Sequence, residues 1–388
     1  MELRVKAVAF RNAPPEFIEN GCKTLKETFP EIAIRFVSDS PDVIWFLSGG
    51  SEQDAIKSMA SGKYYLLLSD FQNNAYAAAT EVKAWADSVQ LTAQLVSIKE
   101  AKKDYLLRTY HTICTAYRSL QGRQAGLIGN VSHWLVASAF PHILAKERFG
   151  INIIHFLLEK LPDYLGFEPD ADFLKVFKHS EYINLEKEAR VYSFLQTIIK
   201  ENQLSGFTLE CFDMVNDRSV TSCLALALLN SRGIAAGCEG DLVSLAGMML
   251  VQALTGTIPW MANIASINEN TVLFAHCTAP LNLLSNFEVR THFETDKSAA
   301  VQGNLNMEEV TVFRLNQQLN KAFISEGKIV SKPRHNFACR TQTEIELPGG
   351  DLEKLKRRPL GNHHLIISGK HRNLLELACR YKQIEIMR

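Results

Sequence analysis

The sequence predicts an α/β protein in which two doubly wound, parallel-sheet regions precede a mainly β region. Three observations carry this prediction. The chain has 388 residues, which at about 150 residues per domain allows two or three domains with their own cores. Its first hundred residues alternate between strand and helix patterns, and short strands separated by turn residues follow residue 260.

The first region contains two near-continuous apolar runs, Val43–Leu47 and Tyr64–Leu68. Such runs are typical of strands that are buried on both faces of a parallel sheet. Helical stretches lie between the runs, and the longest are predicted over 14–29 and 73–89. A long, charge-rich helical segment over 99–120 ends this region, so a domain boundary is expected near residue 120.

The second region opens with a strand and turn over 125–130 and continues with helix patterns over 142–149, 172–177, 186–201 and 219–229. A short strand over 234–238 follows. The uncharged stretch 242–267 is long enough to span a bilayer, but Thr255–Pro259 would break such a helix near its middle. We therefore expect a buried helix of about 13 residues, a turn and a short strand, with the region ending near residue 260.

The sequence pattern of the third region predicts a mainly β fold. Short strands are predicted over 271–275, 310–314, 322–324, 343–347 and 364–367. A helix over 372–381 and a last strand over 384–387 close the chain.

Composition excludes several function classes. Lys and Arg number 42 against 42 Asp and Glu, so the chain lacks the basic footprint of a nucleic-acid binder or a polybasic membrane patch. Its 8 cysteines include no CxxC pair, which disfavours a disulfide scaffold or a zinc ribbon. Charged residues near Met1 replace the apolar core of a secretory signal, so a cytoplasmic location is expected.

Two acidic residues, Glu239 and Asp241, lie between a predicted strand and the buried helix. Asp241 is placed to cap that helix, where its carboxylate would accept backbone N–H bonds and face the positive dipole end. Glu239 would lie just past the carboxyl end of a strand, where open α/β sheets bind ligands. The alternative is that the pair is only a turn acid and a helix cap.

Three histidines lie at strand edges in the third region. His276 follows one predicted strand, and His363 and His364 precede another. Imidazole nitrogens together with the Glu239 carboxylate suit Mn²⁺ or a related divalent ion, although a polar strand edge is the alternative. Adjacent residues on a strand point to opposite faces, so only one of His363 and His364 is expected to reach a given site.

Several short segments, spread over most of the chain, resemble in their order and spacing the L-fucose and L-arabinose isomerase superfamily: Ser48–Glu52, Gly126–Trp134, Cys238–Asp241, Trp260–Asn263, His276–Cys277, Cys339–Thr341 and Gly361–His364. The resemblance implies two Rossmann-like domains, 1–120 and 121–260, the second ending in the Glu239/Asp241 element. It also implies a mainly β, barrel-like domain over 261–388 that carries His276 and His364. A cytoplasmic homo-oligomer, a trimer or hexamer, is implied as well.

The resemblance also assigns roles. It implies that Glu239 is a metal ligand and the acid/base, and that His276 and His364 are metal ligands. The expected cofactor is Mn²⁺, or another divalent cation such as Co²⁺, Mg²⁺ or Zn²⁺. In the family an acidic residue follows the buried helix, whereas this chain has Asn263, whose amide can bind a metal or a hydroxyl group but cannot accept a proton at neutral pH.

The predicted function is a metal-dependent aldose–ketose isomerase, an intramolecular oxidoreductase that acts on a small-molecule sugar through an enediol. A base near the C2 hydrogen and charge stabilisation at O1 and O2 are what this reaction needs. Glu239 is the predicted base, and the predicted substrate-binding residues are Asn263, Asp241, Arg340, His363 and Trp134. The alternatives are another metal-assisted reaction on a polyhydroxylated substrate, of the epimerase or aldolase type, and a non-catalytic sugar-binding protein.

Overall fold

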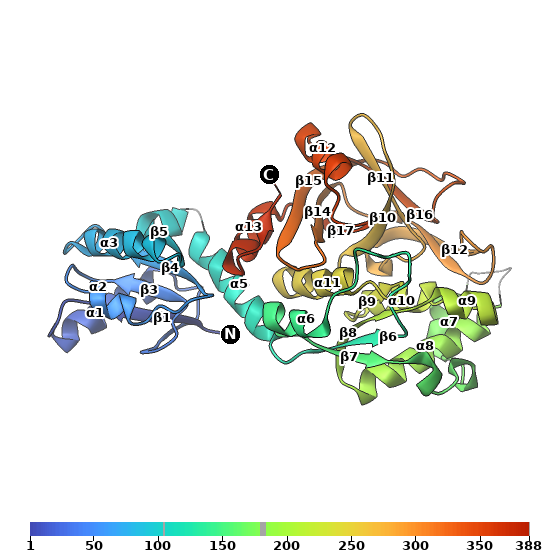
Figure 1. The fold of residues 1–388 in the computed structure, drawn as a ribbon, viewed down its shortest axis with the longest axis horizontal. Helices are drawn as coiled ribbons and strands as arrows, with labels where there is room; N and C mark the ends of the chain where they lie inside the picture. The colour runs from blue at the N-terminus through green and yellow to red at the C-terminus, as the bar shows by residue number, and fades with distance from the viewer. Residues whose placement is uncertain (104, 179–183, 388) are drawn as a thin grey trace. The chain divides into compact units, whose positions relative to one another are not determined.

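The computed structural model describes residues 1–103, 105–178 and 184–387 (Figure 1). The chain divides into two compact units. Unit 1 comprises Met1–Arg118 and Glu376–Ile384, and unit 2 comprises Ser119–Leu375 and Glu385–Arg388. The protein is mixed α/β, with two parallel sheets and a mostly antiparallel third one. The three-domain division and its Rossmann-like character stay predictions.

Unit 1 is built on a five-stranded parallel sheet in the order β2-β1-β3-β4-β5. The strands are β1 (Leu3–Val8), β2 (Ile34–Phe36), β3 (Val43–Phe46), β4 (Tyr64–Ser69) and β5 (Thr92–Ser97). The helices of this part are α1 (Pro15–Thr28), α2 (Glu52–Ile56), α3 (Ala75–Ser88) and α4 (Ile98–Lys103), and α5 (Leu106–Leu120) follows. Every residue of β3 and β4 is buried, which confirms that these apolar runs are inner strands.

Unit 2 begins with a four-stranded parallel sheet in the order β7-β6-β8-β9. Its strands are β6 (Gln124–Ile128), β7 (Asn152–Phe156), β8 (Leu204–Leu209) and β9 (Ala235–Cys238). The helices are α6 (His142–Phe149), α7 (Ala171–Val176), α8 (Glu186–Glu201), α9 (Phe212–Arg218), α10 (Cys223–Ser231) and α11 (Leu242–Thr255). The single helix predicted over 219–229 is wrong at its start, because Ser219 adopts a left-handed conformation, with φ of 52°, that ends α9.

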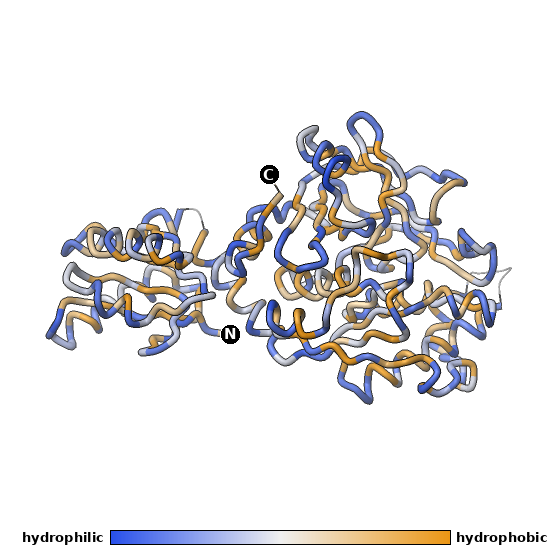
Figure 2. The backbone as a smooth tube through the Cα atoms, viewed as in Figure 1, coloured by the Kyte–Doolittle hydropathy of each residue, from blue (hydrophilic) through white to orange (hydrophobic). Residues whose placement is uncertain are grey.

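Helix α11 is the central element of unit 2. It packs against β8 and β9 on one side and against β14 (Glu309–Leu315) and β17 (His363–Ser368) on the other (Figure 1). This position between two sheets explains why it is apolar all round, as the hydropathy colours of Figure 2 show. Asp241 caps its start and Gly256 ends it, which confirms the predicted buried helix. Among the described residues, no helix is both long and apolar enough to cross a membrane.

Six further strands of unit 2 form a sheet that closes on itself. In the order β14-β17-β10-β11-β16-β15, each strand pairs with the next in antiparallel fashion, and β14 also pairs with β15. The further strands are β10 (Trp260–Ile267), β11 (Thr271–His276), β15 (Lys321–Ser331), β16 (Thr341–Glu346) and the short β18 (Glu385–Ile386). Trp260, Phe274, Phe323 and Ile366 belong to one apolar core within this ring.

Several elements of unit 2 lack a counterpart in the sequence prediction. Strand β12 (Leu284–Arg290) pairs with β13 (Ala300–Leu305) as a separate hairpin, and α12 (Gly349–Arg357) follows β16. Every side chain of β12 is exposed or half-buried. Its sequence therefore lacks the apolar run or the strict alternation by which a strand is predicted. Near the end of the chain α13 (Arg372–Tyr381) follows, as predicted, and the predicted last strand is present as the short β18, which pairs with β15 in parallel.

Candidate functional site

Glu239 lies directly after β9, at the carboxyl edge of the unit 2 parallel sheet. Its backbone is left-handed, with φ of 59°, and Gly240 follows with φ of 68°. A Cβ at Gly240 would lie 2.2 Å from the carbonyl oxygen of Asn130, so only glycine fits there. A strained turn at a ligand-binding edge motivates a functional assignment for Glu239.

The loop after β6 holds the Glu239 carboxylate. The indole nitrogen of Trp134 donates to Oε2 of Glu239 at 2.7 Å. The backbone N–H of Ser132 donates to the backbone carbonyl oxygen of Glu239 at 3.0 Å. Trp134 packs edge-on against Phe212 and remains 44% exposed. The structure thus brings together two of the predicted residues, Glu239 and Trp134, and leaves an aromatic surface open beside the carboxylate.

Asp241 is fully buried behind this turn. Its carboxylate accepts hydrogen bonds from the backbone N–H of Ser244 at 2.7 Å, the Ser138 hydroxyl at 3.0 Å and the Arg314 guanidinium at 3.1 Å. Burial alone would raise the pKa of Asp241, but the charge of Arg314 and the hydrogen bond from His363 outweigh it and lower the pKa. The enclosed carboxylate therefore supports neighbouring side chains, a different placement from the predicted contact with substrate.

His363 connects the two carboxylates. Its Nδ1 donates to Oδ2 of Asp241 at 2.9 Å, and its Nε2 lies 3.6 Å from Oε1 of Glu239. Burial would lower the pKa of His363, but the two carboxylates raise it to about 9. Burial likewise opposes ionisation of Glu239, and the bonds and charges of His363, His276 and Trp134 outweigh it, lowering its pKa to about 2.

His276 lies on the other side of Glu239. The sulfur of Cys238, a carboxylate oxygen of Glu239 and a ring nitrogen of His276 all lie within 4.8 Å of one another. The rings of His276 and His363 are 5.5 Å apart. Nδ1 of His276 has two neighbours from Thr278, the hydroxyl at 2.8 Å and the backbone N–H at 3.1 Å. Burial, followed by the charge of His363, lowers the pKa of His276 to about 3, so the ring is neutral at pH 7.

The structure does not bring His364 to this group. Its Nδ1 bonds to the carbonyl oxygen of Asn362 at 2.9 Å, and its ring lies 5.9 Å from the rings of both Phe274 and Phe323 in the core of the closed sheet. Burial lowers the pKa of His364 to about 3. Of the two adjacent histidines, His363 rather than His364 adjoins the acidic residues, because successive strand residues face opposite ways.

Asn263 lies beside His363. The two residues are directly opposite one another in the β10–β17 pair, which places their side chains on the same face. The amide oxygen of Asn263 accepts a hydrogen bond from Asn362 at 2.6 Å, so its orientation is fixed. This pair of amides forms a polar margin next to the histidine.

Arg340 is occupied elsewhere. Its guanidinium donates to the carbonyl oxygen of Thr291 at 2.7 Å and to the hydroxyl of the same residue at 3.0 Å. It also lies 3.5 Å from the carboxylate of Asp296. These contacts tie Arg340 to the loop between β12 and β13, and its contact with substrate stays a prediction.

Sequence reasoning missed two contributors to the site. Arg314, 1% exposed, donates to Asp241 and to the Ser138 hydroxyl. An arginine that ends an apolar strand run was a usable signal, because a buried cation requires a partner. His292 packs 5.6 Å from the ring of Phe212, and no sequence pattern places it there. Burial lowers the pKa of His292, and the charge of Glu294, ahead of that of Glu239, opposes the fall.

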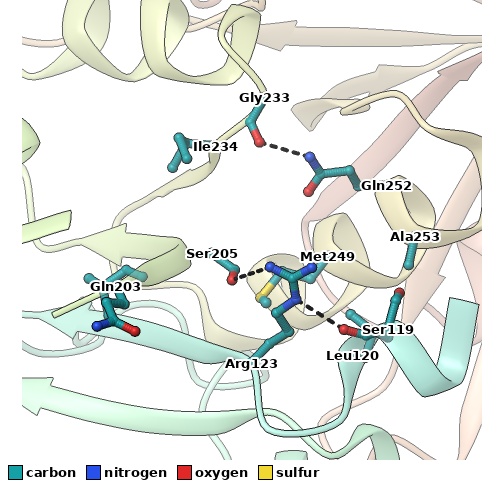
Figure 3. Close-up of a pocket in the computed structure, with 11 residues that line it drawn as sticks. Ser119, Leu120, Arg123, Gln203, Ser205, Gly233, Ile234, Met249, Gln252 and Ala253 are labelled. Atoms are coloured by element: carbon teal, nitrogen blue, oxygen red, sulfur yellow. Dashed lines mark hydrogen bonds between the residues drawn. The ribbon is translucent and has the colours of Figure 1, made fainter. Parts of the chain in front are cut away.

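A cavity of about 470 Å³ lies at the opposite edge of the same sheet (Figure 3). Most of its lining residues precede β6, β8 and β9 or begin them, and Met249, Gln252 and Ala253 of α11 complete the lining. Among the former, Arg123 donates to the Ser119 carbonyl oxygen and to the Ser205 hydroxyl. Open α/β sheets bind their ligands at the carboxyl ends of the strands. The Glu239 group therefore remains the better candidate.

A carboxylate and two imidazoles at the carboxyl edge of a parallel sheet, backed by a buried ion pair, define an acid–base site of the kind that α/β enzymes use. One known protein to which this chain is similar is also an enzyme. No protein-family model matches the chain. It is 26% identical over 297 residues to the sulfoquinovose isomerase of Clostridium sp. (strain MSTE9).

The match covers 70% of this chain and 65% of the length of that enzyme. The chain thus spans less than two thirds of that enzyme, and the similarity is to a sugar isomerase of the fucose/arabinose isomerase-like superfamily. This finding confirms the resemblance that the sequence segments indicated.

Proposed function

We propose that this protein is a sugar isomerase whose acid–base group is Glu239. The observation that carries the proposal is the chain of contacts from Asp241 through His363 to Glu239 at the ligand-binding edge of the sheet. Homology to an isomerase supports the reaction class. An aldose with a free C1 carbonyl is the proposed substrate class, and sulfoquinovose is the first sugar to test.

In the proposed reaction Glu239 removes the proton from C2 of the sugar and returns it to C1. Glu239 is ionised at neutral pH, and the bond from Trp134 aims its carboxylate. Neutral His276, which carries its proton on Nε2, moves the proton between O2 and O1, and the open face of Trp134 packs against the sugar. Asp241 and Arg314 hold the imidazole of His363 in place.

The donor set fits a divalent cation. Nε2 of His363 is buried without a hydrogen-bond partner while Asp241 holds Nδ1, an arrangement typical of metal-ligating histidines. The backbone N–H of Thr278 donates to Nδ1 of His276, so this neutral ring carries its proton on Nε2 and is a hydrogen-bond donor there. Glu239 and His363 would hold Mn²⁺ or a related ion, in place of the predicted set of Glu239, His276 and His364. The ion would stabilise charge on the enediol oxygens.

The test is solvent-deuterium incorporation during turnover. Glu239→Gln should abolish both deuterium incorporation and product formation, since the amide cannot accept the C2 proton. Glu210→Gln is the matched control, because Glu210 lies at the same sheet edge and accepts from the Asn130 backbone N–H at 2.6 Å. Full turnover in Glu239→Gln would remove the assignment, and C–C cleavage or a C2 epimer among the products would replace isomerisation by the corresponding reaction. The homo-oligomeric state and the cytoplasmic location stay predictions.

A further inference from the structure

A second group of metal-binding side chains lies in the third sheet of unit 2. Cys277 directly follows β11 and Cys339 shortly precedes β16, and these strands pair so that the two cysteines lie at the same end. Glu294 comes from the loop between β12 and β13. Three separate stretches of chain thus bring two sulfurs and a carboxylate to one place, where all three ligand atoms lie within 4.8 Å of one another.

We propose that Cys277, Cys339 and Glu294 bind a borderline-soft divalent cation such as Zn²⁺, at a site distinct from the Glu239 group. A tetrahedral zinc site requires sulfur–sulfur separations of about 3.8 Å and sulfur–oxygen separations of about 3.6 Å, given bonds of about 2.3 Å to sulfur and 2.1 Å to oxygen. The sulfur of Cys339 lies 3.4 Å from Oε1 of Glu294, close to that requirement. Small side-chain rotations would therefore complete the three protein ligands.

The surroundings of the group favour an ion. The two cysteines are 3% and 8% exposed, whereas the Glu294 side chain is 39% exposed and gives an ion a route from solvent. The sulfur of Cys277 accepts hydrogen bonds from the backbone N–H groups of Phe293 and Arg340, as metal-bound thiolates commonly do. The fourth coordination position remains for water.

His292 positions the carboxylate ligand. Its Nε2 lies 3.1 Å from the second oxygen of Glu294, and its Nδ1 lies 3.1 Å from the Thr295 hydroxyl. A side chain that orients a ligating carboxylate is a usual second layer of a metal site, and its loss costs about 10–100-fold in metal affinity. The thiol of Cys339 donates a hydrogen bond to Oε1 of Glu294, and an ion that displaces this proton would find the sulfur and the oxygen already side by side.

Cobalt titration of the metal-stripped full chain tests the proposal, because Co²⁺ bound to thiolate gives an intense near-ultraviolet charge-transfer absorption. The wild type should show this absorption with saturation at one thiolate-bound ion per chain. Cys277→Ser and Cys339→Ser should abolish it, and His292→Gln should weaken binding about 10–100-fold.

Cys238→Ser is the matched control, because Cys238 is equally buried, lies 3.2 Å from the Cys211 sulfur and belongs to the Glu239 group. Cys238→Ser and Glu239→Gln should both keep the thiolate absorption, which separates this site from the proposed isomerase site. Glu294→Gln should weaken Co²⁺ binding at least tenfold. Because Glu294 is partly exposed, this variant keeps the proposal testable if a cysteine variant does not fold. The proposal is overturned if the wild type lacks the thiolate absorption. It is also overturned if Cys238→Ser loses this absorption while Cys339→Ser keeps it.

Discussion

Replacing Arg314 by methionine removes a guanidinium that contacts Asp241 from the closed sheet and leaves His363 as its cationic neighbour there. The guanidinium is 1% exposed and donates to Asp241 at 3.1 Å, to the Ser244 hydroxyl at 2.8 Å and to the Ser138 hydroxyl at 2.9 Å. Methionine keeps much of the aliphatic volume, so the change chiefly removes charge and hydrogen bonds.

The loss of folding stability on this change follows from the Asp241 carboxylate, which stays buried without its guanidinium partner. Asp241 is 0% exposed, and after the change His363 alone compensates its charge from the closed sheet. Breaking a buried ion pair by removing one partner costs about 3–5 kcal/mol, and the two serine hydroxyls also lose a charged partner. We expect Arg314→Met to destabilise unit 2 by about 3–5 kcal/mol.

Urea unfolding followed by fluorescence of Trp134 and Trp260 measures this change, since both tryptophans lie in unit 2. Arg357→Met is the control: that side chain is 79% exposed in its pair with Glu353, so a loss below about 1 kcal/mol is expected. Adding Asp241→Asn to Arg314→Met should recover part of the loss, because it removes the uncompensated charge. A cost for Arg314→Met as small as that of the control would refute the reasoning.

Two further predictions concern pH and backbone conformation. The pKa of His364 is about 3 in the folded protein against an ordinary value of 6.5, so its contribution to stability is complete above pH 6.5 and is lost as pH falls toward 3. His364→Leu should reduce the difference in unfolding free energy between pH 6.5 and pH 5 by about 2 kcal/mol, and an unchanged difference in urea titrations would contradict this. Gly240→Ala should lower the thermal midpoint and turnover, because its Cβ would lie 2.2 Å from the Asn130 oxygen. Gly233→Ala, with a similar φ of 86° and nothing within 4 Å, should cost only about 1 kcal/mol; equal effects of the two changes would argue against the clash.

Much of the frame of this protein follows from local sequence. The apolar runs of β3 and β4 predict inner strands because only a parallel sheet covered on both faces tolerates them. The uncharged stretch ended by Gly256 predicts α11, and the cap by Asp241 is confirmed, because capping depends on residues three positions apart. The place of Glu239 after β9 follows from the same local pattern.

Other features depend on contacts between distant segments. The sequence shows that His363 and His364 face opposite ways, but the pairing of β10 with β17 decides that His363 meets the carboxylates and His364 enters the apolar core. Arg314 reaches Asp241 across 73 residues of chain, and Cys339 reaches Glu294 across 45. Periodicity gives the face of a residue within its own strand, whereas the register between strands and the packing of α11 between two sheets determine which faces meet.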